Sequence, residues 1–218
     1  GASYIELTHM AAKGINPFRD YQCYRELKKL YKSIQPDIIF HYTIKPNIYG
    51  TYAAYKGRFK NIAVVTGLGF TFINKGIVPA IAKQLYKVFL AKATMIWFLN
   101  QDDKNLFIRE NIVPEKKVQV LNGEGIDCDV FAPMQGTRPS SQIEFLFIGR
   151  ILIDKGIREY YQAASILKST YPNIQCSVLG YLNAENPMAV KTSDFEQWVS
   201  EGTIHYYGSS ENVSSFIS

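Results

Sequence analysis

Short apolar runs alternate with segments of helical periodicity along the whole chain. In the first half, runs of strand length predict buried parallel strands over residues 37–42, 61–66, 95–99 and 118–121. The predicted helices between them are one capped by Asn16-Pro17 and ended by Pro36, one opened by Pro46, and two over residues 77–89 and 102–110. This alternation of strand and helix is typical of an α/β architecture with a parallel sheet.

A stretch without periodicity separates this half from a second alternating series. It runs from Asn122 to about Gln142 and is rich in Gly, Pro, Ser and Thr, as interdomain connections are. The second series predicts strands over 145–149, 174–180 and 203–207, and helices over 157–167, 193–199 and 210–217. We therefore expect two Rossmann-like, doubly wound parallel sheets, both incomplete, in domains over residues 1–137 and 138–218.

The composition is that of a globular protein, since 47% of the 218 residues are hydrophobic and 20% are charged. No apolar run reaches the length of about 18 residues that a membrane-spanning helix needs, and no secretory signal opens the chain. The cysteines Cys23, Cys128 and Cys176 lie far apart and lack the paired spacing of a zinc site. We expect them to be reduced thiols in a cytoplasmic protein.

The charge is distributed unevenly. Residues 1–120 carry 18 Lys and Arg against 8 Asp and Glu, a net charge of +10, whereas residues 121–218 carry 6 against 11, a net charge of −5. A basic surface attracts phosphates, whether on nucleic acid, on anionic lipid or on a lipid-linked substrate. The alternative is a chance surface composition.

In parallel sheets, ligands bind outside the carboxyl ends of the strands, so the residues after each predicted strand are candidates for a site. His41 and Lys45 follow the first strand and could bind a substrate rich in phosphate or hydroxyl groups. The alternative for His41 is a structural histidine with satisfied hydrogen bonds. Gly67 and Gly69 follow the second strand, where they allow close approach of a ligand or form a plain tight turn.

A further candidate is a diphosphate site in the second half. Gly149 and Arg150 follow a strand, and Lys155 stands where the next helix opens. Two cations and the free N–H groups of a helix N-terminus together suit a diphosphate, although solvated loop cations are the alternative. The sequence Asp127-Cys128-Asp129 has the D-x-D form of some metal sites, but it follows a Gly-rich loop and is interpreted as a turn.

Taken in order, these segments resemble the family-4 retaining glycosyltransferases of the GT-B fold. Within that family they are similar to the branch that builds capsule, O-antigen and N-glycan precursors on polyprenyl diphosphate. The residues that carry the resemblance are Lys45-Pro46-Asn47-Ile48-Tyr49-Gly50, Gly67-Leu68-Gly69-Phe70, Asn100-Gln101-Asp102-Asp103, Gly123-Glu124-Gly125-Ile126-Asp127 with Phe131 and Pro133, Gly149-Arg150 with Lys155-Gly156, and Glu185-Asn186-Pro187.

The resemblance implies a role for each domain and for single residues. Residues 1–137 would be the acceptor side, and residues 138–218 the first part of the donor domain. Arg150 and Lys155 match the pair that holds the donor diphosphate and stabilises the leaving nucleotide, with Gly149 and Gly180 beside the donor. The resemblance assigns His41 as a further catalytic candidate and assigns Lys45, Gly67, Gly69 and Gly125 to the acceptor side of the cleft.

The implied reaction transfers a hexosyl or N-acetylhexosaminyl group from a nucleotide sugar, UDP-linked by expectation, to a polyprenyl-diphosphate-linked saccharide. It would proceed with retention, without metal or cofactor, and without a nucleic-acid partner. Two departures matter: the family's pair of glutamates eight positions apart is missing, and no Gly-rich acceptor loop precedes Tyr4. The resemblance therefore implies the interior of a longer enzyme, with this chain inactive alone. The alternatives are a non-catalytic phosphate-binding, nucleotide-binding or interaction module, and a GT-B sugar-nucleotide epimerase.

Peripheral contact with the inner face of the plasma membrane is the last expectation. The predicted helix over residues 77–89 has one apolar arc, with Lys83 and Lys87 on the opposite side and Lys75 just before it; the arc consists of Ile77, Ile81, Leu85, Val88 and Phe89. Such a helix could lie on an anionic leaflet. The alternative is that the arc packs on the sheet and the lysines are solvated.

Overall fold

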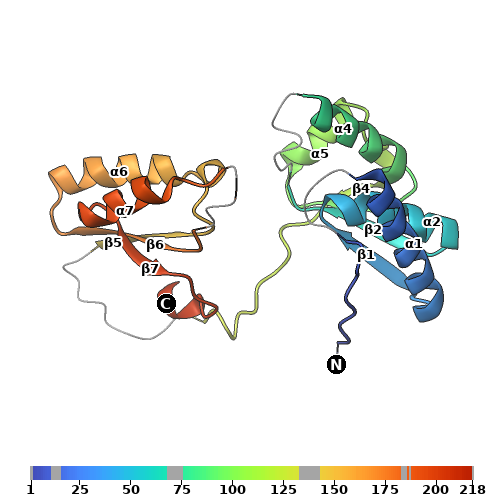
Figure 1. Cartoon of the computed structure of the whole chain (residues 1–218), viewed down its shortest axis with the longest axis horizontal. Coiled ribbons are helices and arrows are strands. Elements are labelled where there is room, and N and C mark those ends of the chain that lie inside the picture. Colours follow the sequence, from blue (N-terminus) through green and yellow to red (C-terminus); the bar gives the residue numbers. More distant parts are fainter. Residues whose placement is uncertain are drawn as a thin grey trace. The chain divides into compact units, whose positions relative to one another are not determined.

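The chain forms two compact units in the computed structural model, Gly1–Gly125 and Ile126–Ser218 (Figure 1). The structure describes residues 2–10, 16–67, 76–132, 143–182, 186 and 188–217. The division between the units lies inside the predicted connecting segment, near its start, whereas the sequence interpretation placed the domain boundary at residues 137/138.

The first unit contains a parallel sheet of four strands in the order β1-β2-β3-β4. Its elements are α1 (Pro17–Ile34), β1 (Ile38–Tyr42), the π-helical turn η1 (Pro46–Gly50), α2 (Thr51–Gly57), β2 (Lys60–Val65), α4 (Ile77–Leu90), β3 (Met95–Phe98), α5 (Gln101–Arg109), the 3-10 turn η2 (Glu115–Lys117) and β4 (Val118–Val120). Each predicted strand and helix of this half is therefore confirmed, with ends shifted by a few residues at most.

The ends of α1 follow from local chemistry. The side chain of Asn16 accepts hydrogen bonds from the backbone N–H groups of Phe18 and Arg19, and Pro17 occupies the first helical position, where no N–H donor is needed. Gln35 ends the helix in the left-handed conformation with a φ of 53°, and Pro36 follows. The predicted cap and the predicted stop of this helix are confirmed.

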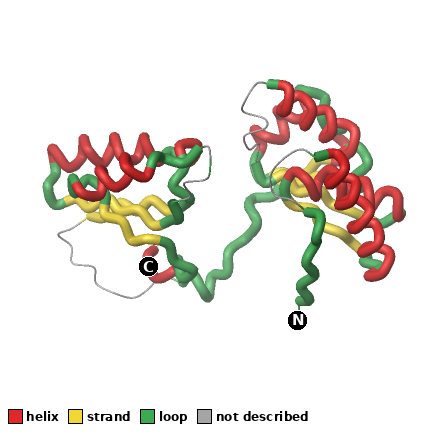
Figure 2. Tube along the Cα trace, in the orientation of Figure 1, coloured by secondary structure: helices red, strands yellow, loops and turns green. Residues whose placement is uncertain are grey.

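The second unit contains a parallel sheet of three strands in the order β5-β6-β7. Its elements are β5 (Ile143–Ile148), the 3-10 turn η3 (Ile153–Lys155), α6 (Ile157–Thr170), β6 (Ile174–Leu179), α7 (Thr192–Ser200), β7 (His205–Gly208) and α8 (Ser214–Ile217). Figure 2 shows α6 and α7 on one side of this sheet. Their apolar residues pack on β6 and β7 in a core that includes Cys176, Val178, Phe195 and Ile204.

Both sheets have sequential strand order, without the order reversal of a doubly wound sheet among the described strands. Because parallel crossovers are right-handed, sequential order places the connecting helices on one face. In β1 the burial alternates accordingly: Ile39 and His41 are buried, whereas Phe40 and Tyr42 on the other face are about half exposed. The prediction of two parallel α/β sheets is confirmed, and the described part of each is singly wound.

Helix α4 buries only part of its predicted apolar arc. Its buried residues include Tyr86 and Leu90, which join the core of the first unit. Ile77, Ile81 and Val88 are instead exposed, at 80%, 45% and 55%. The expectation that the whole arc packs on the sheet is therefore wrong, because α4 is apolar on more than one side and buries the side that carries Tyr86.

Candidate functional site

Glycines form the carboxyl edge of the second sheet. Gly149 follows β5, Gly180 follows β6, and Gly208 ends β7. Backbone hydrogen bonds continue the ladder beyond the strands: the N–H of Gly149 donates to Leu179 O at 3.0 Å, and the N–H of Gly180 donates to Gly208 O at 2.8 Å. Three adjacent strands thus end in positions without side chains, so a ligand can approach the backbone there.

Gly180 is required by the close approach of two backbones. A Cβ atom at this position would lie 1.8 Å from the carbonyl oxygen of Gly149. No flexible side chain could move to relieve this contact, because the neighbour is backbone. The family resemblance assigned both glycines to the donor side, and the structure places their backbones in contact at one edge of the sheet.

Arg150 and Lys155 lie on the loop that leaves this edge, and both are exposed. The loop is anchored between them: Ile151 and Leu152 are buried, the N–H of Ile151 donates to Tyr181 O at 3.2 Å, and the N–H of Ile153 donates to Met188 O at 2.7 Å. The backbone positions of the two cations are thereby fixed while their side chains remain available to an anion.

The same loop ends at the start of α6. Gly156 precedes the helix in the left-handed conformation with a φ of 82°, which glycine adopts without strain. No described side chain caps the first turn of α6, so its N–H groups are available to an anion at the end of the helix that carries partial positive charge. Exposed cations, side-chain-free strand ends and an uncapped helix N-terminus therefore belong to one loop system.

His41, by contrast, is buried in the first unit, with an exposed fraction of 3%. Its Nε2 lies 3.0 Å from the hydroxyl of Tyr31, and its Nδ1 lies 3.3 Å from Oγ1 of Thr51. Gly50 packs on the ring, since a Cβ there would lie 2.6 Å from Cδ2 of His41. This placement does not fit a histidine that faces a substrate, and it corresponds to the structural alternative. Burial lowers the pKa of His41 to about 4.

Lys45 is also engaged within the first unit. Its Nζ lies 2.9 Å from Oδ1 of Asp20, and the hydroxyl of Tyr49 donates to Oδ2 of the same carboxylate at 2.9 Å. The side chains of Lys45 and Asp20 are only 17% and 6% exposed. Asn47 in between donates from Nδ2 to Val64 O at 2.9 Å. Lys45, Asn47 and Tyr49 therefore attach the segment around η1 to α1 and to the end of β2.

The remaining predicted positions are exposed or lie outside the described residues. Gly67 and Gly125 are exposed, and no described atom lies within 4 Å of the position that a Cβ would take at either, whereas Gly69 lies outside the described residues. Asp127 accepts from the N–H groups of Asp129 and Val130 at 3.0 and 3.3 Å, so it is a turn residue. Within the described ranges, no three His, Cys, Asp or Glu side chains are grouped to hold a metal ion.

Asp20 is the residue that sequence reasoning missed. In the sequence it is one acidic residue in the first turn of a helix, and its partners Lys45 and Tyr49 are 25 and 29 positions away.

Asn100 carries a signal for a helix cap in the sequence, because an Asn followed three positions later by an Asp is typical of a helix N-terminus. Its Oδ1 accepts from the N–H of Asp103 at 2.7 Å, so this motif segment caps α5.

Known proteins of similar sequence are glycosyltransferases. Residues 4–100 match the family model described as Glycosyl transferase 4-like. The chain is 26% identical over 215 residues to the N,N'-diacetylbacillosaminyl-diphospho-undecaprenol alpha-1,3-N-acetylgalactosaminyltransferase of Campylobacter jejuni, covering 91% of this chain and 55% of that protein. It is 29% identical over 194 residues to the capsular polysaccharide biosynthesis glycosyltransferase CapM of Staphylococcus aureus, covering 81% and 50%. The chain thus spans about half the length of these relatives.

Solved structures share the fold. A glycosyltransferase from Rickettsia africae matches with a TM-score of 0.65 at 16% identity, covering 95% of this chain and 55% of that one. Anabaena HepE in complex with UDP and glucose matches with a TM-score of 0.64 at 14% identity, covering 88% and 53%. A UDP-N-acetylglucosamine 2-epimerase matches with a TM-score of 0.60 at 15% identity, covering 96% and 55%. The chain is therefore similar in sequence to proteins named as glycosyltransferases, its residues 4–100 match the Glycosyl transferase 4-like family model, and its two α/β units have the GT-B fold.

Proposed function

We propose that the protein containing this chain transfers a hexosyl or N-acetylhexosaminyl group from a UDP-sugar to a polyprenyl-diphosphate-linked saccharide, with retention and without a metal ion. The second unit binds the donor and the first unit binds the acceptor. The observation that carries the proposal is the carboxyl edge of the second sheet, where Gly149, Gly180 and Gly208 end adjacent strands beside Arg150, Lys155 and the uncapped start of α6.

These residues suit the leaving group of such a transfer. As the bond between the anomeric carbon and the diphosphate oxygen breaks, negative charge accumulates on the nucleotide diphosphate. The acceptor hydroxyl oxygen bonds to the same carbon, and its proton passes to the departing diphosphate. Arg150 can donate two parallel hydrogen bonds to phosphate oxygens, and Lys155 supplies a second cation. The first N–H groups of α6 add fixed dipoles that need no reorganisation during the reaction.

The lipid-linked acceptor is inferred from the relatives and from charge. The Campylobacter jejuni relative is named for a diphospho-undecaprenol acceptor, and the Staphylococcus aureus relative for capsular polysaccharide. The first half of the chain has a net charge of +10, which favours a diphosphate acceptor carried by an anionic membrane. None of the described helices is long and apolar enough to cross a bilayer. The contact we propose is a peripheral one, on the inner face of the plasma membrane.

An epimerase or a nucleotide-binding module without catalysis would share the fold. The likeness to a UDP-N-acetylglucosamine 2-epimerase shows that two such units alone do not separate these functions. The sequence relatives favour glycosyl transfer, because both are named as transferases. A polypeptide limited to these 218 residues should turn over no UDP-sugar, because the glutamate pair expected from the family resemblance is missing from it.

Calorimetric titration of the chain with UDP tests the donor site. Arg150→Ala and Lys155→Ala should each weaken binding by roughly tenfold, the loss of one charge-assisted hydrogen-bonding partner. Lys168→Ala is the matched control, because Lys168 lies in the last turn of α6, at the opposite end of the helix. Equal affinities in all three variants would show that Arg150 and Lys155 do not hold the diphosphate.

A further inference from the structure

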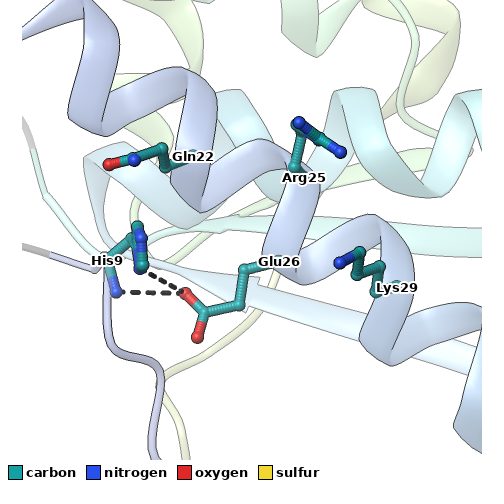
Figure 3. A pocket seen from close by; sticks show the side chains of 5 residues that line it. All are labelled: His9, Gln22, Arg25, Glu26 and Lys29. Atoms are coloured by element: carbon teal, nitrogen blue, oxygen red, sulfur yellow. Dashed lines mark hydrogen bonds and ion pairs between the residues drawn. The ribbon is translucent and has the colours of Figure 1, made fainter.

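Helix α1 presents cations that have no partner among the described residues of the chain. Its two acids are both used internally: Asp20 binds Lys45 and Tyr49, and Glu26 accepts from the backbone N–H groups of Thr8 and His9 at 2.9 and 3.0 Å. Figure 3 shows Glu26 reaching to His9 while the side chain of Arg25 points away from it.

The cations of the outer side of α1 are Arg25, Lys28, Lys29 and Lys32. Their side chains make no hydrogen bond or ion pair with any other residue that the structure describes. Glu26 keeps its negative charge beside them, because hydrogen bonds from backbone N–H groups do not neutralise a carboxylate, so the four cations leave this side of α1 with excess positive charge.

These cations surround a hollow that is also aromatic. Its volume is about 320 Å³, and it is lined by Tyr21, Tyr24, Arg25, Lys28, Lys29 and Lys32, which we call the α1 face. Tyr21 is 57% exposed, and Lys29 and Lys32 are exposed beside it, so the hollow presents both an aromatic ring and ammonium groups to the solvent. A layer of phosphate groups next to an apolar layer is complementary to this surface. The phosphates attract the cations, and tyrosine rings favour the boundary between the polar and apolar layers.

A row of aromatic contacts extends the α1 face across the neighbouring helices. Ring centroids are 6.1 Å apart for Tyr21 and Tyr24, 5.2 Å for Tyr24 and Tyr52 of α2, and 5.1 Å for Tyr52 and Phe89 of α4. Lys56 of α2 lies 5.5 Å from the ring centroid of Tyr52. The helix layer therefore carries mixed aromatic and basic character from α1 to α4.

Helix α4 adds aliphatic side chains at the far end of this row. Val88, next to Phe89 in the chain, is 55% exposed, and Ile81 is 45% exposed. Lys83 cannot serve as a free cation here, because its Nζ lies 2.8 Å from Oε2 of Glu110. Lys87 of α4 is exposed, so α4 contributes a cation as well as exposed aliphatic groups, whereas α1 contributes four cations.

We propose that the α1 face, continued by Tyr52 and Phe89, is the surface by which the first unit docks on an anionic phospholipid bilayer. The cations of α1 bind headgroup phosphates, the tyrosine rings lie at headgroup depth, and Ile81 and Val88 of α4 contact the acyl boundary. This inference rests on the proposed function, because the proposed lipid-linked acceptor is the reason for the protein to bind a membrane. It adds the cations of α1 to the basic docking surface that the sequence placed on the helix over residues 77–89.

Co-sedimentation of the 218-residue chain with vesicles tests the proposal. One vesicle type contains phosphatidylglycerol and phosphatidylcholine, and the other contains phosphatidylcholine alone. The double variant Lys28→Gln/Lys32→Gln should lower the partition onto anionic vesicles by on the order of twentyfold, since each cation near such a surface contributes about fivefold. The charge-matched control Arg109→Gln/Lys116→Gln, on α5 and η2, should lose less than about threefold.

Several outcomes would overturn the proposal. Equal losses in the double variant and its control would mean that net charge alone drives binding, and equal partition onto both vesicle types would remove the role of headgroup charge. Stronger binding of duplex RNA than of vesicles, lost in the same double variant, would assign the α1 face to nucleic acid. An ionic-strength series on the unchanged protein, which should show weaker binding as salt rises, does not depend on the variants folding.

UDP titration of the same samples separates this inference from the proposed function. The double variant should keep the UDP affinity of the unchanged chain, because its substitutions lie in the first unit. Intact UDP binding without membrane binding would count against the docking surface alone, and the reverse would count against the donor site alone.

Discussion

The hydroxyl of Tyr31 lies 3.0 Å from Nε2 of His41, inside the first unit. Both residues are buried, and the ring of His41 is further held by Thr51 at Nδ1. The histidine at the end of β1 therefore links α1, β1 and α2 rather than serving a substrate. The protonation of His41 should therefore affect the free energy of unfolding of the first unit.

The stability of the first unit should fall as the pH is lowered from about 6.5 towards 4. Burial lowers the pKa of His41 from 6.5 to about 4, so in this window the unfolded chain binds a proton that the folded unit does not. The loss should be on the order of 3 kcal/mol, complete near the folded pKa. Urea unfolding followed at Trp97, with Trp198 replaced by Phe, measures it. His41→Gln should flatten the pH dependence, whereas His205→Gln in the second unit should leave it in place.

Breaking the pair of Asp20 and Lys45 should destabilise the first unit strongly. Asp20→Asn leaves the Lys45 ammonium, in a side chain only 17% exposed, without its counter-ion, and should cost about 3 kcal/mol. Lys45→Met should cost a similar amount. The double variant should lose clearly less than the sum, which a double-mutant cycle of urea unfolding would reveal. Additive losses would mean that the two residues do not interact energetically.

Gly180→Ala should destabilise the second unit by at least about 2 kcal/mol, because the new methyl group would collide with the Gly149 carbonyl. Gly67→Ala is the matched control, since no described atom lies within 4 Å of the position that its Cβ would take. Its effect should remain within about 0.5 kcal/mol. Thermal unfolding of both variants provides the comparison, and equal melting temperatures would contradict the close approach of the two glycines.

In an enzyme that contains this chain, Arg150→Ala should lower kcat/KM for sugar transfer by on the order of a hundredfold, because charge on the departing diphosphate would lose its guanidinium partner. Lys168→Ala should leave kcat/KM unchanged, since Lys168 lies at the other end of α6. An Arg150→Ala enzyme with the kinetics of the unchanged protein would refute the role of Arg150 in catalysis.

The fold was predictable because its signals are local. Apolar runs mark the strands, and Asn16 with Pro17 marks the start of α1 by hydrogen bonds within three residues. Which face of an element is buried is not local information. Helix α4 has apolar residues on several sides, and only the position of the sheet determines that Tyr86 and Leu90 are buried while Ile77 is exposed.

The sites divide in the same way. Gly149, Arg150 and Lys155 could be predicted as candidates because parallel topology brings strand ends to one edge, a rule that needs only the strand positions. His41 was misplaced, because the sequence shows that it shares a face with Ile39 but not that helices cover this face. Asp20 was missed, because its partners come from a segment 25 residues or more along the chain.

The central claim, a donor diphosphate at the carboxyl edge of the second sheet, is tested most directly by amide NMR of the chain during UDP titration. The amide chemical shifts of Gly149, of Gly180 and of the first turn of α6 should change until UDP saturates the site. Arg150→Ala should lower the UDP affinity obtained from these curves by roughly tenfold. Saturable changes confined to other residues, or unchanged saturation in Arg150→Ala, would contradict the account.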